Sequence, residues 1–304
     1  MAINRIEINE FLVFRNEITV DFCSGVNVLI GGNGTGKTTL LRMMYGKSNH
    51  FVLGNSNAKF DMYVNSNLFS QLSPIIKDGT VCYVSTSELV DTVFIPESNM
   101  LSHARGLLET VKYGKLHYET REVEIIEKAR VLPSKPKSKT VEEIENIIGG
   151  TVELSADGQV FLINKTQLNY SIDLLFEASG YQKLALLARL IHNEQIKPGA
   201  ILFWDEPENS LNPELIPVLV DIILELSRNG VQVFIATHSE ILSSYFYVNQ
   251  RQGDSVMFHS LYKDKQGQIK ANSNNRFDLL FPNKLTEEPV KLYERQIEKG
   301  LGNG

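Results

Sequence analysis

The amino-acid sequence predicts an α/β fold with a mixed β-sheet core and an inserted lobe of strands and helices. In the second half of the chain, short apolar runs typical of buried strands alternate with longer stretches of helical periodicity. In the first half, a glycine-rich segment separates the apolar run "VNVLI" from the helical stretch "TTLLRMM". A polar and then helical region over approximately residues 47–170 interrupts the alternation, so we expect it to form the lobe.

The composition is that of a globular protein with a sizeable core: 304 residues, 42% hydrophobic and 22% charged. A net charge of −6 gives no overall basic signature for nucleic acid, although a local basic face, and with it DNA binding, stays open. Two cysteines are too few for a disulfide framework or a cysteine metal site, which favours a reducing cytoplasm. We find no signal peptide and no apolar run long enough to span a bilayer, so we expect a cytoplasmic protein without membrane association.

The first expected elements are strands that lead into the glycine-rich loop. Residues 3–22 alternate apolar and polar side chains and predict two antiparallel strands. Residues 26–30 predict a buried strand, and "KTTLLRMMYG" at 37–46 predicts the helix that follows the loop.

The expected lobe begins with a polar region. Residues 47–80 are rich in Asn and Ser and predict irregular structure with one strand near "KFDMYV". The next stretch, 80–96, predicts a hairpin or two short strands. The basic run "PSKPKSKT" at 133–140 contains proline and serine, which favour a solvated loop over an element that follows phosphates.

Helical patterns make up most of the remaining lobe. They cover 100–114, 118–132 and 139–150, the last with a glycine stop at Gly149. A hairpin is expected over 151–163, because Asp157-Gly158 lies between two alternating runs. No heptad pattern is sustained, so a long coiled-coil arm is not expected.

The second half predicts regular α/β elements. Helices are expected at 180–195, 212–230 and 287–302, buried strands at 200–208 and 231–239, and further strands within 255–271.

The segment "IGGNGTGKTT" at 30–39 fits the phosphate-binding P-loop pattern, G-x-x-x-x-G-K-[ST]. In such a loop, backbone N–H groups surround a β-phosphate, and Gly31, Gly34 and Gly36 allow the close approach and the backbone angles that this requires. Lys37 would reach the β- and γ-phosphates, and the hydroxyl of Thr38 would bind Mg²⁺. The following helix would direct its N-terminal dipole at the anion. The alternative is a glycine-rich turn without a ligand.

Two adjacent carboxylates follow the apolar run "AILFW". Asp205 and Glu206 would lie at the C-terminal end of a buried strand, which is where ligands bind in open parallel sheets. Asp205 is expected to hold Mg²⁺ through water, and Glu206 to orient and deprotonate the attacking water. An acidic turn after a core strand is the alternative.

Together, "DEPENSLNP", "EASGYQKLALL" and "IATHS" resemble the ATP-binding-cassette (ABC) ATPases. With the opening "IEINEFLVFRNEITVDFCSGVNVLIGGNGTGKTTLL", the chain is more similar to their soluble RecF, SMC and OLD-like branch, and within it to a compact group without long coiled coils. The resemblance covers nearly the whole chain. It implies a single ABC-type ATPase head over residues 1–304, a P-loop NTPase fold with the lobe at about 47–170 inserted.

The resemblance assigns further residues. Ser179, Gly180 and Gln182 match the signature that binds the γ-phosphate of an ATP held by a partner subunit, although Tyr181 replaces the usual second glycine. His238 matches the histidine that contacts the γ-phosphate. The expected nucleotide-binding residues are Gly31, Asn33, Gly34, Thr35, Gly36, Lys37, Thr38, Thr39, Ser179, Gly180 and Gln182. The expected catalytic residues are Glu206, Lys37 and His238, and the expected metal ligands are Thr38 and Asp205.

Two other family positions are less regular. Ser210-Leu211-Asn212 matches the D-loop, with Asn212 where aspartate is common. The Q-loop glutamine is missing, and Glu97 or Asn99 could serve the metal in its place. A capped helix start at 96–102 is an equally good interpretation of that segment.

These features predict an ATPase whose two heads enclose ATP as a homodimer or higher assembly and act as a switch or clamp. By analogy with the family, the role would be anti-phage defence or DNA repair. The 41 residues that follow "FHSLYK" are too few for an effector domain, so a separate effector protein such as a nuclease is expected. Two alternatives stay open: a scaffold that holds ATP with negligible hydrolysis, and the ATP-binding subunit of an ABC transporter.

Overall fold

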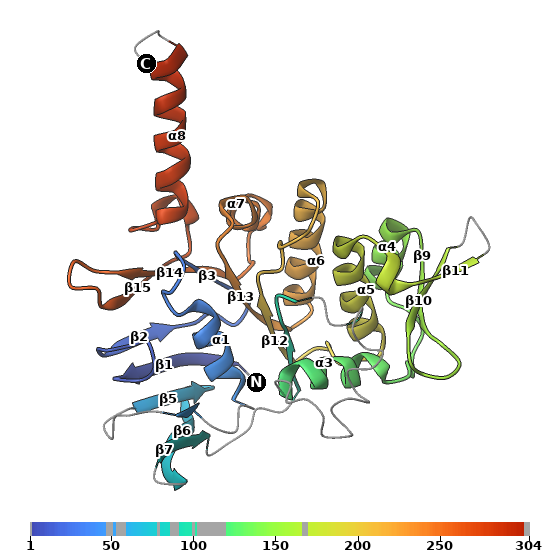
Figure 1. Ribbon diagram of the computed structural model, residues 1–304, viewed down its shortest axis with the longest axis horizontal. Helices are drawn as coiled ribbons and strands as arrows, with labels where there is room; N and C mark the ends of the chain where they lie inside the picture. Colours follow the sequence, from blue (N-terminus) through green and yellow to red (C-terminus); the bar gives the residue numbers. More distant parts are fainter. Residues whose placement is uncertain are drawn as a thin grey trace. The chain divides into compact units, whose positions relative to one another are not determined.

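The computed structural model describes residues 2–46, 51–52, 59–77, 80–85, 91–98, 101, 120–165 and 170–300 (Figure 1). The chain divides into two compact units. The first comprises Met1–Glu88 and Phe234–Gly304, and the second Leu89–Val233. This division does not follow the expected lobe boundaries, and the single head with an insertion at 47–170 stays a prediction.

The first unit contains an antiparallel sheet with the strand order β2-β1-β5-β6-β7-β4. Its strands are β1 (Ile3–Asn9), β2 (Ile18–Asp21), β4 (Phe51–Val52), β5 (Lys59–Val64), β6 (Asn67–Lys77) and β7 (Thr80–Ser85). The two strands expected over residues 3–22 are confirmed as β1 and β2, which pair antiparallel. In β1, Ile3, Ile6 and Ile8 are buried, while Arg5 is exposed and the other residues are half-buried.

The expectation of irregular structure over residues 47–80 is wrong for β6, a strand of 11 residues. The first half of β6, up to Gln71, pairs with β5, and the second half, from Leu72 onward, pairs with β7. Its backbone groups are therefore satisfied by two neighbours, and this pairing outweighs the weak strand preference of its Asn and Ser residues. The strand expected near "KFDMYV" is confirmed as β5.

The first unit also contains part of a mixed sheet. β3 (Val26–Ile30) is buried along its whole length and pairs in parallel with β14 (Val256–Lys263), and β14 pairs antiparallel with β15 (Ile269–Asn274). The chain returns to this unit within β13 (Gln232–Thr237), where the ring of Phe234 meets that of Phe22 edge to face. The buried strands predicted at 26–30 and 231–239 are thus confirmed.

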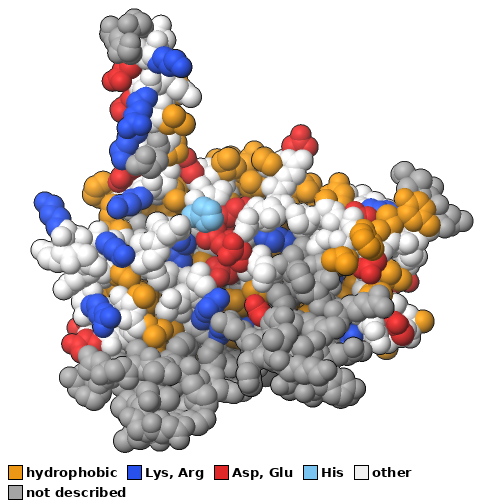
Figure 2. Space-filling view, in the orientation of Figure 1, with side chains coloured by type: hydrophobic (Ala, Val, Ile, Leu, Met, Phe, Trp, Pro, Cys, Tyr) orange, Lys and Arg blue, Asp and Glu red, His pale blue; other side chains and the backbone are white. Residues whose placement is uncertain are grey.

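The helices of the first unit are α1 (Lys37–Tyr45), α7 (Glu240–Asn249) and α8 (Lys284–Gly300). α1 confirms the helix predicted after the loop, and it ends at a left-handed glycine, Gly46. α7 was not predicted from the sequence, although Ser239 gives it a regular N-cap by accepting a hydrogen bond from the Leu242 backbone N–H. α8 extends away from β14 and β15, and charged side chains line one side of it with hydrophobic ones beside them (Figures 1 and 2). Among the described residues, no helix combines the length and the hydrophobicity that a membrane span requires.

His259 on β14 is a buried polar residue that ties three segments together. Its Nδ1 lies 2.7 Å from the Ser273 hydroxyl, and its Nε2 lies 3.2 Å from Oδ1 of Asn27. That oxygen also accepts a hydrogen bond from the Cys23 backbone N–H, so Nε2 carries the proton of a neutral ring. Burial lowers the pKa of His259 to about 3, against a smaller opposing influence of Asp21.

We expect acid to destabilise the protein through His259. The folded-state pKa lies below the ordinary value of 6.5, so the unfolded chain takes up a proton that the folded chain excludes. The contribution of neutral His259 to the free energy of unfolding is fully present above pH 6.5. It decreases by about 1.4 kcal/mol per pH unit as the pH falls towards 3. In urea unfolding, the stability advantage of wild type over His259→Gln should shrink by about 3 kcal/mol between pH 7 and pH 4.5. Parallel pH profiles of the two proteins would contradict this.

The second unit combines helices with a small antiparallel sheet and a parallel strand pair. Its α-helices are α3 (Thr120–Arg130), α4 (Lys139–Ile148), α5 (Ser179–His192) and α6 (Ile216–Arg228), and its short helices are η2 (Leu174–Phe176) and η3 (Pro213–Leu215). Its strands are β8 (Thr92–Ile95), β9 (Gly150–Leu154), β10 (Phe161–Lys165), β11 (Tyr170–Asp173) and β12 (Ile201–Asp205).

Most predicted elements of this unit are confirmed. β9 and β10 form the hairpin expected around Asp157-Gly158, and the unpredicted β11 adds to β10. The stretch 80–96 contains two separate strands and not a hairpin, since β8 pairs in parallel with β12. The helix expected at 100–114 lies outside the described residues apart from Leu101.

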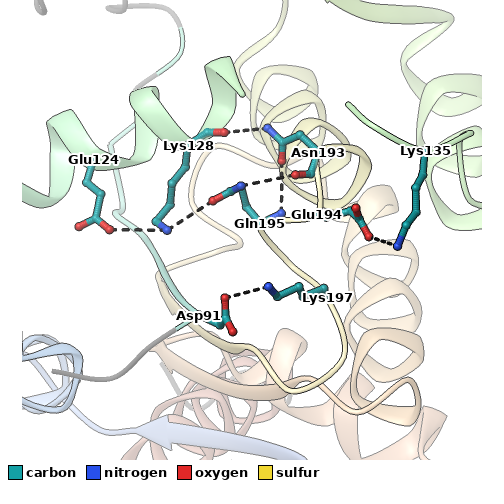
Figure 3. A network of polar contacts seen from close by, with 8 residues as sticks. All are labelled: Asp91, Glu124, Lys128, Lys135, Asn193, Glu194, Gln195 and Lys197. Atoms are coloured by element: carbon teal, nitrogen blue, oxygen red, sulfur yellow. Dashed lines mark hydrogen bonds and ion pairs between the residues drawn. The ribbon is translucent and has the colours of Figure 1, made fainter. Parts of the chain in front are cut away.

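A polar network joins α3 to the end of α5 (Figure 3). Lys128 of α3 bonds to Gln195 at 3.5 Å and pairs with Glu124 at 3.6 Å, while the Asn193 amide donates to the Lys128 carbonyl at 2.7 Å. Lys135 pairs with Glu194. The basic run at 133–140 therefore has acidic neighbours within its own unit, which agrees with a solvated structural loop.

Candidate functional site

The P-loop sequence lies between β3 and α1 of the first unit and has the expected backbone geometry. Gly31, Gly34 and Gly36 have φ angles of 152°, 72° and 91°, a region that L side chains rarely adopt. Lys37 is the first residue of α1, and its ammonium donates a 2.8 Å hydrogen bond to the Gly31 carbonyl. The positive charge of Lys37 and the N-terminus of α1 thus lie at the same loop, where both favour an anion.

The glycines of this loop are also required by close packing. A Cβ on Gly31 would lie 2.2 Å from the carbonyl oxygen of Leu261 in β14, and one on Gly36 would lie 2.7 Å from the ring of Phe14. By contrast, a Cβ on Gly32 would meet no atom within 4 Å. The loop therefore packs closely against β14 and the first hairpin, and only Gly32 of these three glycines has open space beside it.

The other predicted residues of the loop differ in exposure. Asn33 and Gly34 are exposed, Thr38 and Thr39 are half-buried, and Thr35 is buried with its hydroxyl donating to the Gly32 carbonyl at 2.8 Å. A lysine that the sequence analysis missed also lies here: the Lys263 ammonium is 3.7 Å from where a Cβ of Gly34 would be. Glycine backbone, two lysines and a threonine hydroxyl are donors and ligands that suit a Mg²⁺-bound phosphate chain.

His238, in the same unit, is the first residue after β13 and is exposed. The residues on either side of it fix the local backbone. The Ser239 N–H donates to the Thr237 hydroxyl at 2.8 Å, and Ser239 caps α7. His238 thus occupies a rigid junction between a buried strand and a capped helix.

In the second unit, Asp205 is the last residue of the fully buried strand β12 and Glu206 is the first residue after it, and they are 4% and 8% exposed. Burial of two carboxylates is costly unless they have partners. Glu206 has a φ of 47°, a left-handed conformation that is unfavourable for a residue with a side chain. Backbone strain at a buried acidic residue is typical of functional sites.

Glu97, the candidate for the missing glutamine, lies in this part of the unit. Its Oε1 accepts a 2.6 Å hydrogen bond from the Asn209 side chain, three residues beyond Glu206. Asn99, the other candidate, lies outside the described residues. Trp204 is wholly buried in β12, so its ring packs in the core.

The signature residues begin α5 in the same unit. The Ser179 hydroxyl donates to the Ser210 carbonyl at 3.2 Å, and Gly180 is buried against Leu211. The Gln182 side chain points back into the unit and donates to the Glu177 carbonyl at 2.8 Å, so its position also serves the fold. The start of α5 therefore contacts the segment that matches the D-loop.

Comparisons with known proteins assign the chain to a family. Residues 85–244, more than half of the chain, match the family described as "AAA domain, putative AbiEii toxin, Type IV TA system". The chain is 25% identical to the "Arginine transport ATP-binding protein ArgV" of Corynebacterium glutamicum over 219 residues, covering 70% of this chain and 69% of that protein.

Two solved structures show the same fold. The SMC head domain from Thermotoga maritima is 16% identical with a TM-score of 0.50, and an SMC head bound to the C-winged helix domain of ScpA is 14% identical with a TM-score of 0.55. Each alignment covers 90% of this chain and 98% of the other. The P-loop NTPase fold predicted from the sequence is therefore confirmed, and the chain belongs to the AAA domain family of putative AbiEii toxins with a P-loop domain of the ATPase type.

Proposed function

We propose that the protein binds and hydrolyses ATP as a head that dimerises around the nucleotide and acts as a switch or clamp. The observation that carries this proposal is the loop at 31–37, where three left-handed glycines and Lys37 meet at the N-terminus of α1. Membership of an ATPase-type family supports it.

The proposed roles follow from the chemistry of each side chain. Lys37 and the loop N–H groups would bind the β- and γ-phosphates, and His238 would donate to the γ-phosphate. Thr38 and Asp205 offer the oxygen ligands that Mg²⁺ prefers, and the ion when bound would neutralise charge on the phosphates. Glu206 would accept the proton of the attacking water.

Assembly and biological role are further parts of this proposal. Ser179 and Gly180 would contact the γ-phosphate held by a second copy, so that ATP links two chains and hydrolysis loosens them. The role would lie in anti-phage defence or DNA repair, with a separate effector such as a nuclease, and with DNA as a possible further partner.

The test measures native mass and phosphate release together. Wild-type protein with ATP and Mg²⁺ should release phosphate and shift to a larger mass. Neither effect is expected with ADP, or with ATP in the presence of a metal chelator. A mass that does not respond to ATP, without phosphate release, would reject the proposal in favour of a nucleotide-holding scaffold or of a site that needs another protein.

A transporter role is a second candidate, favoured by the similarity to the Corynebacterium relative, an arginine transport ATP-binding protein. The separation of 142 positions between Lys37 and Ser179 (179 − 37 = 142) is longer than we expect for that class. Recovery of the native protein in the membrane fraction with a transmembrane partner would support this candidate over the clamp.

A further inference from the structure

The turn that follows β12 holds Glu206 in its left-handed conformation, and the start of α5 is fastened to this turn. Glu206 and Ser210 both have positive φ angles, 47° and 61°, although neither is glycine. Two such residues within five positions are unfavourable, so surrounding contacts must hold the turn in place.

Lys183 makes the central contact. Its ammonium donates a 3.1 Å hydrogen bond to the backbone carbonyl of Glu206, and the side chain is only 5% exposed. The same carbonyl accepts the turn bond from the Asn209 N–H at 3.1 Å. Burial lowers the pKa of Lys183, and the neighbouring carboxylates oppose this, foremost Glu208 and Glu97, followed by Glu206 and Asp205.

Two further contacts fasten the far end of the turn to α5. The Ser179 hydroxyl donates to the carbonyl of Ser210, the second strained residue. A Cβ on Gly180 would lie 3.0 Å from Leu211, so the helix and the turn are in close contact there. One turn of α5 separates Ser179 from Lys183, so a single helix start holds both strained ends.

We propose that Lys183 is a positioning residue that fixes the backbone of Glu206. It thereby couples the orientation of the Glu206 carboxylate to the first turn of α5. This proposal rests on the proposed role of Glu206 as general base. Because Ser179 and Gly180 lie on the same helix turn, a ligand that moves this turn also moves Glu206. Occupancy of one nucleotide site would thereby alter catalysis at the other.

The first measurement is independent of activity. Hydrogen exchange in the peptide covering 206–211, followed by mass spectrometry, should be about 10-fold faster in Lys183→Met, because a hydrogen bond from a charged donor is lost. Lys183→Gln, of similar length, retains an N–H donor and should lie between Met and wild type. Lys197→Met is the matched control, since Lys197 pairs with half-exposed Asp91 at 2.9 Å (Figure 3). Unchanged exchange at 206–211 would overturn the proposal.

The second measurement uses ATP turnover. In Lys183→Met, kcat should fall about 10- to 100-fold while the Kd for ATP changes less than about threefold. Equal loss of kcat in the Lys197→Met control, or a loss confined to ATP binding, would contradict positioning. If wild type releases no phosphate but exchange at 206–211 still accelerates in Lys183→Met, the positioning of the Glu206 backbone by Lys183 stands and the proposed hydrolysis fails.

Discussion

Glu206→Gln is expected to reduce phosphate release by about 10²- to 10³-fold while ATP stays bound. The amide keeps the size of the side chain but cannot accept a proton from water at neutral pH. The backbone carbonyl that Lys183 and Asn209 hold is unchanged by the substitution, so the strained turn should keep its form. ATP should therefore accumulate in the site, and the proposed dimer should persist.

The measurement compares native mass and phosphate release of Glu206→Gln with wild type in ATP and Mg²⁺. Glu214→Gln is the control, because Glu214 is an exposed carboxylate in η3 of the same unit and should behave as wild type. If wild type already binds ATP without hydrolysis and the variant behaves identically, the catalytic role of Glu206 is wrong and the scaffold alternative is favoured.

Gly31→Ala is expected to destabilise the protein by about 3 kcal/mol or more and to remove ATP binding. The new methyl group would lie 2.2 Å from the Leu261 carbonyl and 2.9 Å from the Thr35 hydroxyl, at a φ of 152° that alanine rarely adopts. The end of β3 would have to move away from β14, and the loop that carries Lys37 would move with it.

Gly32→Ala is the matched control for this effect. It adds the same methyl group one residue away, where no atom lies within 4 Å. Its stability should remain within about 1 kcal/mol of wild type. Thermal or urea unfolding, with binding of a fluorescent ATP analogue, distinguishes the two. Equal stability of both variants would show that contact with Leu261 does not constrain the loop.

The sequence by itself determined the features that depend on local geometry. The order of β3, glycine loop and α1, the hairpin at Asp157-Gly158 and the helix stop at Gly149 were all predictable, because turn and cap residues act over a few positions. The adjacent carboxylates Asp205 and Glu206 were also identified from sequence, since they directly follow a continuous apolar run.

Only the tertiary structure decided the features that depend on distant partners. β6 is a strand because β5 and β7 satisfy its backbone, although its composition predicts a loop. The bond from Lys183 to Glu206 spans 23 residues, and a lysine in an apolar helix gives no sign of its acceptor. Backbone strain at Glu206 is likewise invisible in the sequence, because a φ angle follows from the contacts that hold it.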